Sequence, residues 1–144
     1  MKRLLLLLVL GWIIALTACS GAGAGQVGDH TPVAPAAGLG SLSGSVSSAS
    51  TFWTGEALYV YAATFNGNSA DEGFYVLDTS RAPSAELAAD GWFQLKDMTP
   101  GKYVLVVGPT AEQGRLVADA DGKARIFTVT ADEVTDLGEL GLKD

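Results

Sequence analysis

The fold of this chain is decided by residues 90–107, which read DGWFQLKDMTPGKYVLVV. Asp90-Gly91 predicts a tight turn, because glycine accepts the positive φ that such turns require. Phe93 and Leu95 then alternate with polar neighbours and point to one face of a strand. Pro100-Gly101 predicts a second turn, with Pro at its second position and Gly at its third. The apolar run 102–107 follows, so the stretch predicts two core strands joined by a turn.

Similar short runs, rich in β-branched and aromatic residues and separated by turn residues, continue on both sides of this stretch. The run 57–65 is apolar on both parities, which predicts a central strand covered on both faces. The segment 119–122, Asp-Ala-Asp-Gly, predicts the turn of a hairpin. In 134–142, Leu137 is out of phase with Leu140 and Leu142, and a bulge near Gly138 would reconcile them. The predicted strands are 41–47, 57–65, 74–78, 92–96, 102–107, 115–118, 124–129 and 134–142.

About seven or eight short strands at this spacing predict an all-β chain folded as a single two-layer β-sandwich of the immunoglobulin or prealbumin kind. The one helical candidate is 84–90, which contains Ala85, Leu87, Ala88 and Ala89. A helix of two turns is marginal without packing, so a short helix and a loop are both compatible with this segment.

Residues 90–107 resemble the core motif of carboxypeptidase regulatory-like domains, which are transthyretin-like (prealbumin-like) seven-stranded β-sandwiches. The flanks agree, since 42–46 resemble the opening strand of that family and 134–138 resemble its closing strand. The likeness covers nearly all of 41–144 and implies a fold rather than a function, because this scaffold hosts many roles. The long segments 66–73 and 108–124 depart from the family pattern and leave strand pairing there open.

The first residues have the order of a secretory signal. Met1-Lys2-Arg3 supplies the cations, residues 4–16 are apolar, and small residues precede Cys19. As a helix, 4–16 would reach only about 20 Å, short of a hydrocarbon core of about 30 Å. We therefore expect a cleaved signal at 1–18, while an uncleaved anchor and an ordinary secretory signal are the alternatives.

Leu16-Thr17-Ala18-Cys19 resembles the lipobox of bacterial lipoproteins. That resemblance implies a diacylglyceryl group on the Cys19 sulfur, cleavage before Cys19, and further acyl chains such as palmitate. Cys19 is the chain's only cysteine, and a free thiol exported to an oxidising space would be a liability. The expected location is extracytoplasmic, with a lipid anchor in the cell membrane or outer membrane. Ser20 after Cys19 resembles an outer-membrane sorting signal.

Residues 19–40 are mostly Gly, Ala and Pro and repeat at neither a helix nor a strand period. We expect a flexible linker of about 25 Å that holds the domain 41–144 away from the bilayer. His30, the only histidine of the chain, lies in this linker and is expected to be solvated.

The charge balance argues against two classes of partner. The chain carries 9 Lys and Arg against 16 Asp and Glu, and Lys2 and Arg3 leave with the signal, so the mature net charge is −9. An acidic surface of this kind disfavours nucleic acid and anionic lipid headgroups. The predicted partners are the membrane, through the anchor at Cys19, and an unidentified protein or glycan.

The sequence offers no assembled catalytic or metal site. The predicted domain contains no histidine and no nucleophile motif, and its paired carboxylates lie in predicted loops, where solvation is the default. Asp119-Ala120-Asp121-Gly122 resembles the start of a calcium loop, yet the position that needs Glu is Thr130. We therefore expect no enzyme activity, no metal and no cofactor. A broad hydrolase screen is the cheap test of this expectation.

The aromatic side chains allow a second hypothesis. Trp92 is out of phase with Phe93 and should face outward, and Trp53 lies beside a predicted loop at 51–55. Exposed indoles can stack on sugar rings, although sandwich cores also hold such residues. The primary expectation is a non-catalytic interaction or structural module, and the alternative is a carbohydrate-binding module that uses Trp53 and Trp92.

Overall fold

A computed structural model describes residues 30–47 and 49–142 of the 144-residue chain. Cys19, the predicted signal 1–18 and the first part of the predicted linker lie outside these residues. Within the described residues, no helix is long and apolar enough to cross a membrane.

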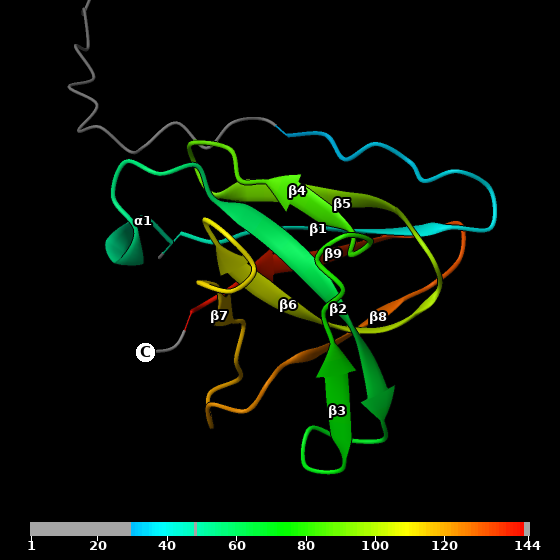
Figure 1. The fold of residues 1–144 in the computed structure, drawn as a ribbon. Helices are drawn as coiled ribbons and strands as arrows, with labels where there is room; N and C mark the ends of the chain where they lie inside the picture. Colours follow the sequence, from blue (N-terminus) through cyan, green and yellow to red (C-terminus); the bar gives the residue numbers. More distant parts are fainter. Residues whose placement is uncertain (1–29, 48, 143–144) are drawn as a thin grey trace, which may run out of the picture.

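The described chain forms two β-sheets that face one another, which confirms the all-β sandwich (Figure 1). The smaller sheet has the order β5-β1-β9, and the larger sheet is built around β2 and β6. The strands are β1 (Gly40–Ser45), β2 (Tyr59–Gly67), β3 (Gly73–Val76), β4 (Ser84–Glu86), β5 (Trp92–Met98), β6 (Gly101–Gly108), β7 (Arg115–Leu116), β8 (Ile126–Val129) and β9 (Val134–Glu139), and one short helix, α1, spans Ala49–Phe52.

The larger sheet has two long central strands with short strands placed end to end on each side. β2 and β6 pair along most of their length, which confirms the predicted central strand at 57–65. β3 and β4 share the other edge of β2, and β7 and β8 share the other edge of β6. The predicted hairpin at 115–129 forms next to its turn, where Ala118 and Ala124 bridge and the Arg125 N–H donates to the Val117 carbonyl. Farther from the turn the two segments separate, because the free edge of β6 offers both of them a longer partner.

The predicted turn at Pro100-Gly101 is a crossing between the two sheets. β5 belongs to the smaller sheet and β6 to the larger one, and only Thr99 and Pro100 separate them. Gly101 begins β6 and has no positive φ. The Tyr103 hydroxyl donates a hydrogen bond of 2.7 Å to the Thr99 carbonyl, which ties the crossing to the strand that follows it.

Two bulges adjust the faces of the smaller sheet. In β9, Ser43 pairs with Asp136 and Ser45 with Glu139, so one extra residue lies between them, and Gly138 has φ +66°. This confirms the bulge predicted near Gly138. A second bulge lies in β5, because Gly40 pairs with Met98 while Leu42 pairs with Leu95. The extra residue reverses the alternation, so Met98 joins Phe93 and Leu95 in the core.

The main core lies between the sheets and draws on both of them. Its largest buried side chains include Phe93, Leu42, Leu95, Met98 and Leu105. Each such side chain contributes about 1.5–3 kcal/mol by leaving water. A smaller cluster of Ala63, Phe65 and Val104 covers the opposite face of the larger sheet, as expected for a β2 strand that is apolar on both parities.

The helical alternative for 84–90 is wrong. Residues 84–86 form β4 and pair with Tyr59–Tyr61 of β2, and this pairing supplies backbone partners that an isolated two-turn helix would lack. The helix that does form, α1, covers the segment just before Trp53, where the sequence predicts a loop.

Residues 30–38, called the strap below, lie against the domain instead of extending freely from it. In Figure 1 this blue segment runs beside β5 before the chain turns back into β1. Its backbone and His30 are bonded to side chains of Asp90, Gln94, Asp97 and Asp132. This part of the predicted linker is therefore in contact with the domain, whereas the sequence predicts a segment that holds the domain away from the bilayer.

Candidate functional site

The turn at Asp90-Gly91 positions a small cluster of aromatic and acidic side chains. Gly91 has φ +84°, as the turn prediction requires, and a Cβ there would lie 2.5 Å from the Val46 carbonyl oxygen. Asp90 Oδ1 accepts the Trp92 N–H at 3.1 Å, which closes the turn and begins β5. Trp92 then points outward, opposite to the buried Phe93, as the alternation predicts.

His30 covers one face of the Trp92 indole. The two rings are stacked, with centroids 4.3 Å apart and planes 9° from parallel. His30 Nε2 lies 2.8 Å from Asp90 Oδ2, and because a carboxylate can only accept, Nε2 carries the proton of this bond. The expectation that His30 is a solvated linker residue is therefore wrong. No sequence pattern links residues 30 and 92, which is why the contact could not be predicted.

A cleft of about 490 Å³ opens beside this turn. Its lining residues include Trp53 and three acidic residues, Glu56, Glu86 and Asp90, together with apolar residues such as Leu87. An indole beside several hydrogen-bond acceptors is the combination that sugar rings require. Trp53 is also packed partly against the main core.

The two tryptophans of the sugar hypothesis therefore occupy different places. Trp53 lines the cleft, whereas Trp92 is not among its lining residues and is stacked against His30. The structure does not bring the two rings together on one platform. Any sugar in the cleft would meet Trp53 alone.

A second candidate surface is the edge strand β3. Phe74, Tyr75 and Val76 are 63%, 44% and 52% exposed, and they form most of the large exposed apolar side chains among the described residues. Among the described strands, β3 pairs only with β2 and so ends the larger sheet. In Figure 1 the β2–β3 hairpin projects from the body of the sandwich. The sequence predicts a strand at 74–78 but gives no sign that both faces of this strand are exposed.

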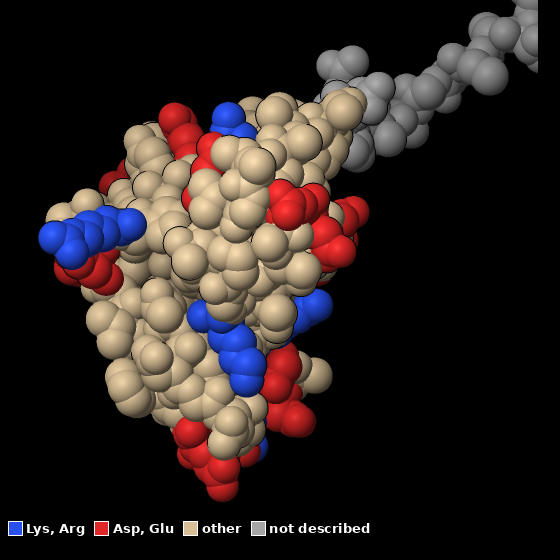
Figure 2. All heavy atoms as spheres, turned by 90° about the vertical axis from the view of Figure 1, so that its right-hand side faces the viewer, with Lys and Arg blue, Asp and Glu red and all other residues tan. Residues whose placement is uncertain are grey.

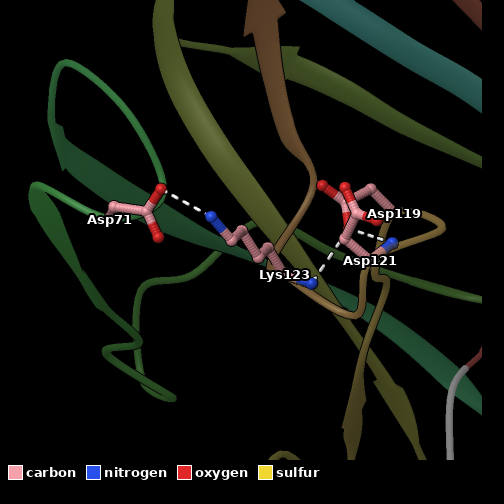
Figure 3. A network of polar contacts seen from close by, with 4 residues as sticks. All are labelled: Asp71, Asp119, Asp121 and Lys123. Atoms are coloured by element: carbon pink, nitrogen blue, oxygen red, sulfur yellow. Dashed lines mark hydrogen bonds and ion pairs between the residues drawn. The ribbon is translucent and has the colours of Figure 1, made fainter.

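The acidic segment at 119–122 forms a closed turn, as predicted. Asp119 Oδ1 accepts the N–H groups of Asp121 and Lys123 at 3.0 and 2.9 Å (Figure 3). The Lys123 ammonium reaches across to Asp71 Oδ2 at 2.6 Å, and this hydrogen bond raises the pKa of Lys123. Both partners are exposed, so the pair adds little stability. In residues 30–47 and 49–142, no three His, Cys, Asp or Glu side chains gather as metal ligands.

On the face shown in Figure 2 the charged side chains lie in small groups, several with a basic side chain beside an acidic one, and uncharged areas lie between the groups. This face presents no continuous basic surface of the kind that binds a phosphate backbone.

Comparison of the chain with protein-family models and with curated proteins finds no match in either case.

Proposed function

We propose that this chain is a membrane-anchored lipoprotein whose β-sandwich is a non-catalytic interaction module, and that it binds an extended segment of a partner protein along β3. The observation that carries the interaction is the exposed apolar edge formed by Phe74, Tyr75 and Val76. The proposed anchor is acylated Cys19. The proposed scaffold is the carboxypeptidase regulatory-like, transthyretin-like sandwich that residues 90–107 resemble.

The chemistry of an edge strand favours another strand as its ligand. Along its outer side, β3 carries backbone N–H and C=O groups that β2 does not use, and an added strand pairs with such groups. Phe74 and Val76 alternate with Tyr75, so apolar side chains flank the added strand on both faces. Because exposed apolar edges also invite aggregation, an edge of this composition is best explained by a partner that covers it.

The test of the anchor is Cys19→Ser. We expect this variant to leave the membrane fraction, because stable anchoring depends on two or three acyl chains and the diacylglyceryl group cannot be attached without the Cys19 sulfur. A variant that stays in the membrane fraction, or native protein that mass spectrometry finds unacylated, would contradict the proposed anchor.

The test of the edge uses a photo-crosslinking residue at Tyr75, with the same residue at Gln113, which is exposed and lies outside both β3 and the strap, as the control. A polypeptide captured only from position 75 is identified by its crosslinked segment, which is then synthesised. We expect that peptide to slow amide exchange in β3 and to lose binding when Phe74 and Val76 are both changed to Lys. A peptide that leaves β3 exchange unchanged would contradict an added strand.

The cleft beside Trp53 supports a second candidate function, carbohydrate binding. Trp53 offers an indole face on which a sugar ring can stack, and the acidic residues Glu56 and Glu86 line the same cleft. Glycan pull-down should be lost in Trp53→Ala and kept in Trp92→Ala, because Trp92 lies outside the cleft lining. Equal loss in both variants would contradict this cleft as the binding site.

A further inference from the structure

The strap lies parallel to β5 and in register with it. The residue numbers of the contacting pairs rise together along both segments. His30 contacts Asp90, Val33 contacts Gln94 and Ala36 contacts Asp97, with sequence separations of 60, 61 and 61 residues. The last contact joins the Gly38 N–H to Asp132 Oδ1 at 2.7 Å. The first three contacts hold residues 30–36 along β5, and the fourth lies in the turn at 37–38, where Gly38 has φ +78°. A segment held in this way has the geometry of a bound peptide.

Three of these four contacts engage the backbone of the strap and not its side chains. The Val33 N–H donates to Gln94 Oε1 at 3.0 Å, and Gln94 Nε2 donates back to the Val33 carbonyl at 2.5 Å. The Ala36 N–H donates to Asp97 Oδ1 at 2.7 Å. On the domain side every partner is a side chain, so these residues recognise an extended backbone, much as an added strand is recognised by its main chain.

The prolines of the strap lie at positions whose backbone nitrogen takes no part in these hydrogen bonds. Pro32 and Pro35 immediately precede the two donors Val33 and Ala36. Proline fixes its own φ and pushes the preceding residue to an extended conformation, which lowers the entropy that the segment loses on docking. The sequence of the strap is thus prepared for this extended conformation.

The domain side of the contact contains backbone strain. Asp97 and Asp132 have φ of 54° and 62°, and they are the only non-glycine residues with positive φ in the described part of the chain. Both are the aspartates whose carboxylates hold strap N–H groups. Strained residues of this kind cluster at ligand clamps, and the bulge at Asp97 is a device that redirects a side chain.

The strap does not satisfy every polar group of this face. Ser43 pairs with Gln94 across β1 and β5, which places both side chains on the outward face. Ser41 and Ser43 are 0% and 1% exposed, and their hydroxyls have no hydrogen-bond partner among the described residues. These two hydroxyls are buried polar groups that the strap covers without bonding, so the strap leaves part of the hydrogen-bonding capacity of this face unused.

We propose that the outer face of β5 is a binding site for an extended, proline-spaced polypeptide, which residues 30–38 occupy within their own chain. The same segment presented by a second copy of the chain is the ligand that binds when the site is vacated. Trp92, Gln94, Asp97 and Asp132 form the site. The internal segment competes at an effective concentration on the order of millimolar, so it blocks the site until it is released.

The experiment uses the full-length chain and a synthetic peptide of residues 30–38, HTPVAPAAG. The double variant Val33→Pro, Ala36→Pro removes the two N–H donors and should open the site, whereas Ala34→Pro changes a residue that donates none of these bonds. We expect the peptide to bind the double variant at least tenfold more tightly than the wild type or Ala34→Pro, and to lose that binding when Gln94→Ala is added. Equal binding to all forms, or binding that survives Gln94→Ala, would overturn the proposal.

A second arm needs no opened variant and so does not depend on its folding. In the wild-type chain, millimolar peptide should accelerate amide exchange at Val33 and Ala36 by at least threefold while the β6 amides stay protected. Strap exchange that does not respond to the peptide would overturn the proposal, even if the double variant failed to fold.

Discussion

The imidazole of His30 lies flat on the indole of Trp92, with ring centroids 4.3 Å apart. This stack joins the first described residue of the chain to the first residue of β5, and the Asp90 carboxylate holds the imidazole from the side. The contact fixes the start of the strap. Its contribution can be measured separately from the backbone contacts that follow it.

We predict that His30→Ala lowers the free energy of unfolding by about 1 kcal/mol, since it removes one aromatic stack and one part-exposed hydrogen bond. Urea unfolding at unchanged m-value measures this loss, and stronger acrylamide quenching should report the uncovered Trp92. His30→Phe keeps the stack and loses the hydrogen bond to Asp90, so its free energy of unfolding should lie between those of wild type and His30→Ala. An unfolding midpoint identical to wild type would contradict a stabilising stack.

We predict that Gly91→Ala destabilises the domain by about 2–3 kcal/mol. The new methyl group would meet the Val46 backbone at 2.5 Å, in addition to the cost of an alanine at φ +84°. Gly55→Ala is the matched control, because Gly55 has φ +78° with open space around it and should cost only about 1 kcal/mol. Equal costs, measured by denaturant unfolding, would show that the close approach to Val46 does not matter.

The Asp97 bulge gives a third prediction. Asp97→Asn keeps an acceptor oxygen and a side chain that tolerates positive φ, so it should change stability by less than about 0.5 kcal/mol. Asp97→Ala loses the bond to the Ala36 N–H and adds strain, so it should cost about 2 kcal/mol and speed Ala36 amide exchange. Similar effects of the two substitutions would contradict the role of this carboxyl in holding the strap.

The features predicted from sequence depend on local patterns. The alternation of Phe93 and Leu95 and the double-sided apolar run of β2 appear within single segments, and both are confirmed. The bulge at Gly138 was predictable because Leu137 conflicts in phase with Leu140. Met98 conflicts in phase with Leu95 in the same way, so the bulge at Asp97 carried an equally clear signal.

The features that sequence analysis missed depend on distant partners. β4 forms where a short helix was an alternative, because β2 offers it an edge. β7 and β8 pair with β6 instead of with each other for the same reason. At the candidate site, the cleft beside Trp53 and the stack of His30 on Trp92 join segments that share no motif. A single sequence gives the composition of these sites but not their assembly.

The last prediction concerns Tyr103, whose side chain is 6% exposed and whose hydroxyl donates to the Thr99 carbonyl at the crossing between the sheets. Tyr103→Phe should cost about 1 kcal/mol near neutral pH through loss of this hydrogen bond. The variant keeps the ring in the core, so the main packing contacts remain.

Alkaline pH should reduce the difference in free energy of unfolding between wild type and Tyr103→Phe. Burial raises the pKa of Tyr103 above its ordinary value of 10.0, so the folded state favours the neutral phenol. Its contribution is therefore complete below about pH 10 and is lost as pH rises through the folded pKa, because the unfolded tyrosine ionises first. Burial, Tyr59 and Glu112 also raise the pKa of Tyr61, but wild type and variant share that effect. Urea unfolding from pH 8 to 11 should show the gap between the two proteins shrinking above about pH 10, and a constant gap would contradict this linkage.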